Sequence, residues 1–225
     1  MNTESFWERE ETVQEFAGRD PDHRLVALLE RYVEPAEVRI LDIGCAGGRN
    51  TELLARRGFD LYALDTSQAM VARTRERVGA ILGTAEAERR IRVSHMRDLN
   101  LFAAESFDLV VALGVFHNAT DEDEWDQALS EAARVLKIGG RLLSSSFSPA
   151  SEPKGQLVRP VAGKPHLFEG FSSGPLLLLT AEELDARLAK LALRPEVPTE
   201  TVKAPRDEGF RVSVNGLYRK KWRND

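Results

Sequence analysis

The chain has 225 residues, of which 42% are hydrophobic and 30% charged, proportions that suit one well-cored globular domain. Its formal net charge of −5 argues against a nucleic-acid partner, because such a partner favours a basic surface. No apolar run approaches the roughly 20 residues of a membrane span, the first residues are polar and acidic, and the single cysteine fits a reducing compartment, so we expect a cytoplasmic protein without a membrane partner.

Residues 5–34 carry apolar side chains at helical spacing. This spacing predicts two amphipathic helices, which are separated near residues 18–21, where a glycine and a proline occur. We interpret Trp7 and Phe16 as core residues in preference to a cofactor lid. These helices are expected to form a cap over residues 1–36.

From residue 38 onward, apolar runs of strand length alternate with helical patterns. The predicted strands span residues 38–43, 61–64, 91–96, 107–113 and 141–147. The predicted helices span residues 48–57, 67–78 and 121–137, with Thr66 or Ser67 capping the second, Thr120 with Asp123 capping the third, and Gly139-Gly140 ending it. This alternation predicts a parallel sheet with helices on both faces, in a core of residues 37–147.

The alternation stops at residues 148–180, which are rich in proline, glycine and serine but also hold phenylalanines and a run of four leucines at 176–179. We expect a structured insertion that covers the substrate. Residues 181–225 return to regular structure, with a capping box at Thr180–Glu183 opening a helix to about residue 192. Strands near 194–202 and 210–219 are joined by a short polar link, which permits only antiparallel pairing.

The most informative segment is the turn that follows the strand at 38–43. Gly44-Cys45-Ala46-Gly47-Gly48 is a small-residue turn that leads into a helix, where a ligand can lie against bare backbone. The next strand ends in Asp65, about twenty residues after Gly44, the spacing at which a carboxylate accepts both hydroxyls of a ribose. A nucleoside-containing cofactor is therefore predicted. A nicotinamide dinucleotide is disfavoured, because Ala46 stands where its G-x-G-x-x-G fingerprint needs a second glycine.

Residues 41–48 resemble the first motif of the class I S-adenosylmethionine-dependent methyltransferases, with Ala46 in place of the usual glycine. Asp65 matches the ribose-binding acid of that family, Asp98-Leu99 its adenine-facing pair, and residues 114–117 and 136–140 its later motifs. Residues 48–50 and the closing strand also resemble the tellurite-resistance type. The resemblance implies an α/β, Rossmann-like, seven-stranded, mostly parallel sheet with an antiparallel last strand. It also implies S-adenosylmethionine as cofactor and a small-molecule methyl acceptor.

The cofactor-binding candidates implied by this resemblance are Gly44, Cys45, Ala46, Gly48, Asp65, Thr66, Met70, Asp98, Leu99, Leu113 and Gly114. His117 directly follows the fourth strand, so it is the candidate to assist the acceptor as a base, with a packed or capping histidine as the alternative. The remaining histidines are too scattered for a metal site.

Two other functions stay open beside small-molecule methyl transfer: a non-catalytic or regulatory protein that binds the cofactor, and a nicotinamide-dependent oxidoreductase. Composition and motifs identify neither the acceptor nor the oligomeric state.

Overall fold

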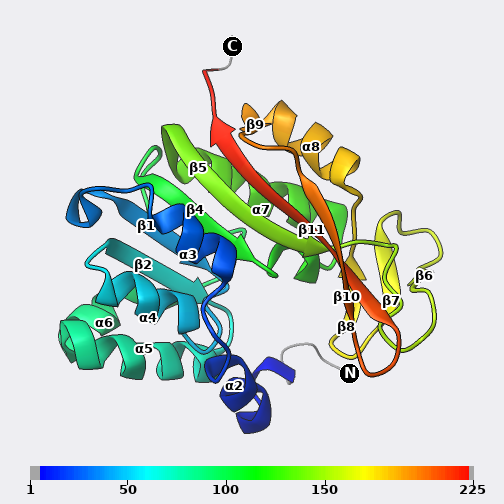
Figure 1. The fold of residues 1–225 in the computed structure, drawn as a ribbon, viewed down its shortest axis with the longest axis horizontal. Coiled ribbons are helices and arrows are strands. Elements are labelled where there is room, and N and C mark those ends of the chain that lie inside the picture. Colours follow the sequence, from blue (N-terminus) through cyan, green and yellow to red (C-terminus); the bar gives the residue numbers. More distant parts are fainter. Residues whose placement is uncertain (1–5, 223–225) are drawn as a thin grey trace.

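The computed structural model describes residues 6–222, which are built around a twisted central sheet (Figure 1). The order of its strands is β10 (Glu200–Pro205), β11 (Phe210–Lys220), β5 (Leu136–Phe147), β4 (Phe107–Leu113), β1 (Arg39–Ile43), β2 (Asp60–Asp65) and β3 (Ile91–Val93). The strands from β5 to β3 are parallel, whereas β11 runs antiparallel to β5 and to β10. The predicted Rossmann-like sheet with an antiparallel last strand is thus confirmed.

The outer edge of the sheet differs from the expectation of a single sixth strand. Short strand β9 (Leu193–Pro195) pairs with the end of β11, and β10 pairs with its beginning, so both lie along the same edge of β11. Pro195 is the last paired residue of β9, and Pro198 falls between the two pairings. Because proline has no backbone N–H to donate to a ladder, one continuous strand is interrupted here.

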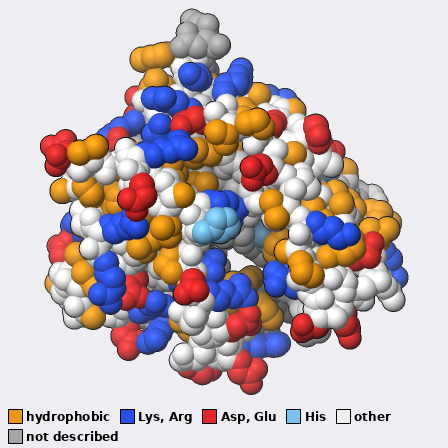
Figure 2. Space-filling view, viewed as in Figure 1, with side chains coloured by type: hydrophobic (Ala, Val, Ile, Leu, Met, Phe, Trp, Pro, Cys, Tyr) orange, Lys and Arg blue, Asp and Glu red, His pale blue; other side chains and the backbone are white. Residues whose placement is uncertain are grey.

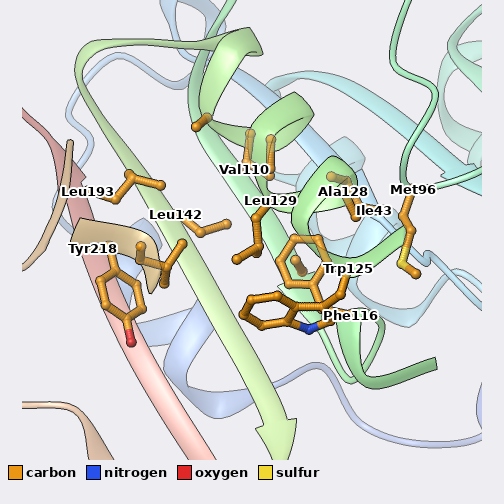
Figure 3. Close-up of a cluster of buried hydrophobic side chains, with 14 of the residues drawn as sticks. Ile43, Met96, Val110, Phe116, Trp125, Ala128, Leu129, Leu142, Leu193 and Tyr218 are labelled. Atoms are coloured by element: carbon orange, nitrogen blue, oxygen red, sulfur yellow. The ribbon is translucent and has the colours of Figure 1, made fainter. Parts of the chain in front are cut away.

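Helices cover both faces of the sheet, as predicted. They are α2 (Glu10–Ala17), α3 (His23–Leu29), α4 (Arg49–Arg56), α5 (Gln68–Leu82), α6 (Thr84–Arg90), α7 (Glu122–Val135) and α8 (Ala181–Lys190), with short 3₁₀ turns at Pro35–Glu37 (η1) and Phe116–Asn118 (η2). Successive strand residues point to opposite faces. Ile40 therefore packs with α3, α4 and α5, and Leu41 with α7 and α8. Figure 3 shows the cluster that lies between the sheet and α7 and α8, with Trp125 at its centre.

The boundaries around α7 correct two expectations. Its N-cap is Asp121, whose carboxylate accepts the Glu124 N–H at 2.8 Å, so Thr120 is not the capping residue. The helix ends at Val135, and β5 begins directly at Leu136, which pairs with Phe107. The capping box of α8 is present as predicted, with Thr180 and Glu183 bonded reciprocally.

Residues 148–180 form a second, small sheet of β6 (Arg159–Pro160), β7 (Leu167–Phe171) and β8 (Gly174–Leu177). Its own apolar cluster includes Val158 and Leu176 and packs against Phe147 at the end of β5. Figure 1 shows this sheet beside the tip of the β10–β11 hairpin. The insertion therefore stands at the carboxyl ends of the parallel strands.

No helix within residues 6–222 combines the length and the apolar character that crossing a bilayer requires.

Candidate functional site

Two connected cavities lie at the carboxyl ends of the parallel strands, where ligands bind in open α/β sheets. The inner cavity, about 270 Å³, is lined by the turn after β1 and the end of β2. The outer cleft, about 1070 Å³, extends from Leu113 and Gly114 to the insertion and the β10–β11 hairpin. Residues shared by both linings are Trp7, Phe16, Arg49, Leu113, Gly114 and Asn118. Figure 2 shows a hollow in the middle of this face, with Lys and Arg side chains at its margin.

The turn after β1 exposes bare backbone to the inner cavity. Gly44 has φ +71°, and a Cβ there would lie 2.8 Å from Val115, so only glycine fits. Gly44, Cys45 and Ala46 all line the cavity. Burial raises the pKa of the Cys45 thiol well above its usual value, which leaves the thiol neutral and unsuited to nucleophilic chemistry.

Gly48 and Met70 are not part of the lining. Gly48 has φ +84°, and its missing side chain lets α4 approach Thr74 of α5. Met70 is fully buried in the first turn of α5, where its N–H donates to Ser67 Oγ. Asp42 is likewise buried and accepts a hydrogen bond from Thr51 at 2.7 Å. These residues stabilise the turn without lining the cavity.

Asp65 ends β2 with its carboxylate at the inner cavity. It accepts hydrogen bonds from the backbone N–H groups of Ala46 at 2.9 Å and Ser67 at 3.0 Å. Burial raises the pKa of Asp65, and these backbone donors oppose that rise. A carboxylate offers about four acceptor positions, so capacity remains for the hydroxyls of a bound sugar. Thr66, the next residue, also lines the cavity.

The opposite end of the inner cavity differs from the prediction. Asp98 is exposed and accepts from Asn100, and the Leu99 N–H donates to the Glu131 carboxylate at 3.1 Å. Neither residue lines the cavity, and the Leu99 N–H already has its partner. The adenine contact of this pair stays a prediction.

Residues that the sequence analysis did not single out as ligand contacts stand there instead. Glu124 is buried, accepts from the Thr120 N–H and hydroxyl at 2.7 and 2.6 Å, and lies 3.0 Å from His95 Nε2. His95, Met96, Thr120 and Glu124 all line the inner cavity. In the sequence, Glu124 belongs to what looks like an ordinary acidic helix start. Only its tertiary contact with His95 distinguishes it from the other acidic residues there.

The N-terminal cap closes over the turn after β1. A Cβ on Gly47 would lie 2.7 Å from Ala17 Cα, so α2 rests directly on this glycine. The Glu8 carboxylate accepts the N–H groups of Gln68 and Ala69, which ties the segment before α2 to the start of α5. Trp7 and Phe16 are half-buried and line both cavities, which corrects their interpretation as core residues.

The outer cleft lies between two aromatic clusters. On one side Phe6, Trp7 and Phe16 meet edge to face at 4.9 and 5.2 Å between ring centroids. On the other side Phe147 stacks on His117 at 4.4 Å and on Phe171 of the insertion at 5.2 Å. The cleft therefore offers flat apolar surfaces on two sides.

His117 is only 4% exposed, although its ring contributes to the cleft wall. Within residues 6–222 its ring nitrogens have no hydrogen-bond partner. Burial, reinforced by the charge of Arg211, lowers the pKa of His117 to about 3. A base with so low a pKa holds an abstracted proton poorly, so the geometry favours a packed, neutral imidazole over a general base.

The inner cavity fits an adenosyl group. The Asp65 carboxylate lies beside the glycine turn, the turn presents its backbone to the cavity, and Ile43, Leu64 and Met96 supply apolar surface. The passage at Leu113 and Gly114 would place the reactive end of such a ligand at the outer cleft.

Comparison with known proteins agrees with this fit. Residues 41–144 match a family model described as a methyltransferase domain. The chain is 29% identical over 217 residues to the 27-O-demethylrifamycin SV methyltransferase of Amycolatopsis mediterranei, a match that covers 92% of this chain and 74% of that one. The chain spans only 18% to 52% of the length of the first curated relatives that it matches.

Solved structures show the same fold. A 1,6-didemethyltoxoflavin-N1-methyltransferase of Burkholderia thailandensis, solved with S-adenosylhomocysteine, has a TM-score of 0.62 and 21% identity, with 89% and 78% of the two chains covered. The (4+2) cyclase SpnF has a TM-score of 0.69 and 17% identity, with 98% and 97% covered. By this sequence match residues 41–144 are a methyltransferase domain, and the chain has the fold of a methyltransferase solved with S-adenosylhomocysteine.

Proposed function

We propose that this protein transfers a methyl group from S-adenosylmethionine to a small molecule bound in the outer cleft. The observation that carries the proposal is the junction of the two cavities. The inner cavity is lined by Asp65 and the glycine turn, and it shares Leu113 and Gly114 with the lining of a larger cleft that has aromatic sides. A donor and an acceptor can thus meet at a single point between β4 and the N-terminal cap.

The residues of the inner cavity would hold and orient the cofactor. Asp65 would accept hydrogen bonds from the ribose hydroxyls, and the Gly44–Ala46 backbone would contact the cofactor directly. His95 and Glu124 line the far end of the cavity. When bound, S-adenosylmethionine supplies a sulfonium-activated methyl, so the acceptor lone pair forms the new bond as the carbon–sulfur bond breaks, leaving S-adenosylhomocysteine. The protein mainly provides proximity and alignment, effects that are worth about 7–11 kcal/mol.

The cap and the insertion would exclude water from the acceptor. Trp7 and Phe16 come from residues 1–36, and Pro153 and Phe171 from residues 148–180, and all four line the cleft. We propose that these two segments set acceptor specificity, in a cytoplasmic protein that acts on neither nucleic acid nor membrane.

A second function has one observation in its favour. The cyclase SpnF shares this fold over nearly the whole chain, so the fold is compatible with chemistry other than methyl transfer. A protein that binds the cofactor without using its methyl group is the alternative. The similarity to proteins described as methyltransferases favours the first proposal.

Calorimetric titration and labelled-methyl transfer separate these functions. We expect S-adenosylhomocysteine to bind and NAD not to bind, and radiolabel from S-adenosylmethionine to appear in one or more compounds of a small-molecule acceptor panel. Binding without any transfer would favour the non-catalytic alternative. Binding of NAD alone would contradict the cofactor assignment.

A further inference from the structure

Arg211 lines the outer cleft, and its burial without an ion-pair partner among the described residues suggests that it binds a ligand. It lies on β11 and is half-buried, with its guanidinium 5.1 Å from the Phe147 ring centroid. Phe147 pairs with Ser213, so Arg211 extends from the same strand pair that carries the aromatic stack. Within residues 6–222 this guanidinium has neither an ion pair nor a hydrogen bond.

Among the described residues, none of the carboxylates around the cleft forms an ion pair with it. Glu15 is paired with Arg19, and Asp22 is paired with Arg24 at 2.6 Å. The acidic residues of the hairpin turn, Asp207 and Glu208, are exposed. Burial, together with the like charges of Arg206 and Arg19, lowers the pKa of Arg211 to about 10, so the group remains a cation at neutral pH. A half-buried cation without a partner is costly unless an anion completes it.

The chemistry at the junction points the same way. His117 is a poor base, and two carboxylates of the cleft, Glu15 and Asp22, are engaged in ion pairs. The described residues at this point therefore offer little help in removing a proton from the acceptor. An acceptor whose reacting oxygen is already deprotonated needs no such help.

We propose that the acceptor is a planar aromatic anion, whose ring lies between the two aromatic clusters and whose charged oxygen is bound by Arg211. This inference rests on the proposed function, and it adds the class of acceptor. Arg49 lines both cavities, so it cannot distinguish the acceptor from the cofactor. Arg211 lines the outer cleft and not the inner cavity, and we assign the anion contact to it for that reason.

The test compares binding of benzoate, 4-hydroxybenzoate and 2-naphthoate with binding of their neutral primary amides, by calorimetry, with and without S-adenosylhomocysteine. We expect the intact protein to bind at least one acid about tenfold or more tightly than its amide, since a hydrogen bond to a charged group contributes at that level. Arg211→Gln should abolish the preference, and Arg211→Lys should keep part of it. Arg219→Gln, a change of an exposed arginine on the same strand, is the matched control and should behave as the intact protein.

Equal binding of acids and amides, no measurable binding of any acid at millimolar concentration, or a preference that survives in Arg211→Gln would each overturn the acceptor class. S-adenosylhomocysteine affinity, measured in every variant, must stay unchanged and also reports that Arg211→Gln is folded. Because the acid comparison requires no methyl transfer, failure of the proposed function would be visible separately, as absent cofactor binding or absent transfer.

Discussion

Asp65 connects the end of β2 to the turn after β1, and the cofactor proposal depends on its carboxylate. We expect Asp65→Ala to weaken S-adenosylhomocysteine binding by about tenfold to a hundredfold, because charge-assisted hydrogen bonds are lost. Calorimetric titration measures this directly. Asp60→Ala, at the other end of the same strand, removes a carboxylate that pairs with Arg90 far from the cavity. Equal affinity losses in the two variants would remove Asp65 from the site.

The burial of His117 leads to a prediction of how the stability of the protein depends on pH. Its pKa is lowered to about 3 in the folded protein, against about 6.5 when unfolded. The unfolded chain therefore binds the extra proton first, so stability is complete above pH 6.5 and declines as the pH falls toward 3. Between these pH values, this residue lowers the free energy of unfolding by about 1.4 kcal/mol for each pH unit.

The variant His117→Phe keeps a ring that can stack on Phe147 but cannot titrate. We expect its free energy of unfolding to fall less than that of the intact protein between pH 7 and pH 5, measured by denaturant titration. His23→Gln, a change of an exposed histidine on α3, is the control. Parallel pH curves for His117→Phe and the intact protein would contradict a buried, neutral His117.

At the scale of elements, α2 and the insertion are the parts expected to respond to ligand. The segment before α2 is tied to α5 through Glu8, and α2 rests on Gly47. We expect S-adenosylhomocysteine to slow hydrogen exchange in α2 and in residues 148–180, because both line the cavities. Helix α6 lies outside both linings and should not change. Protection confined to residues 40–120 would show that neither segment closes on the ligand.

Most elements of the core follow from local patterns, and the failures have local causes. Strands β1, β2 and β4 lie close to their predicted ranges because their apolar runs are bounded by turn residues. Gly139-Gly140 resembles a helix stop, but these glycines lie inside β5, where the register with β4 shifts and Gly139 has φ +79°. Helix α6 was not predicted, since its short polar sequence carries no apolar periodicity.

At the scale of the whole molecule, the site is only partly predictable. Gly44 and Asp65 belong to consecutive β–α units, so their spacing along the chain sets their spacing in the fold. Trp7, His95 and Glu124 come from three distant segments, and Arg211 comes from the last strand. Their convergence depends on how the cap, α7 and the hairpin pack, which no single segment of sequence encodes.

The passage that joins the two cavities has a kinetic consequence. If the cofactor reaches the inner cavity past Leu113 and Gly114, an acceptor in the outer cleft blocks its path. We then expect compulsory-order turnover in which the donor binds first and its demethylated product leaves last. Initial-rate measurements should show S-adenosylhomocysteine competing with S-adenosylmethionine but not with the acceptor. Random-order patterns would mean that the α2 cap opens a second entrance, so the same helix that closes the site would also control how quickly each round ends.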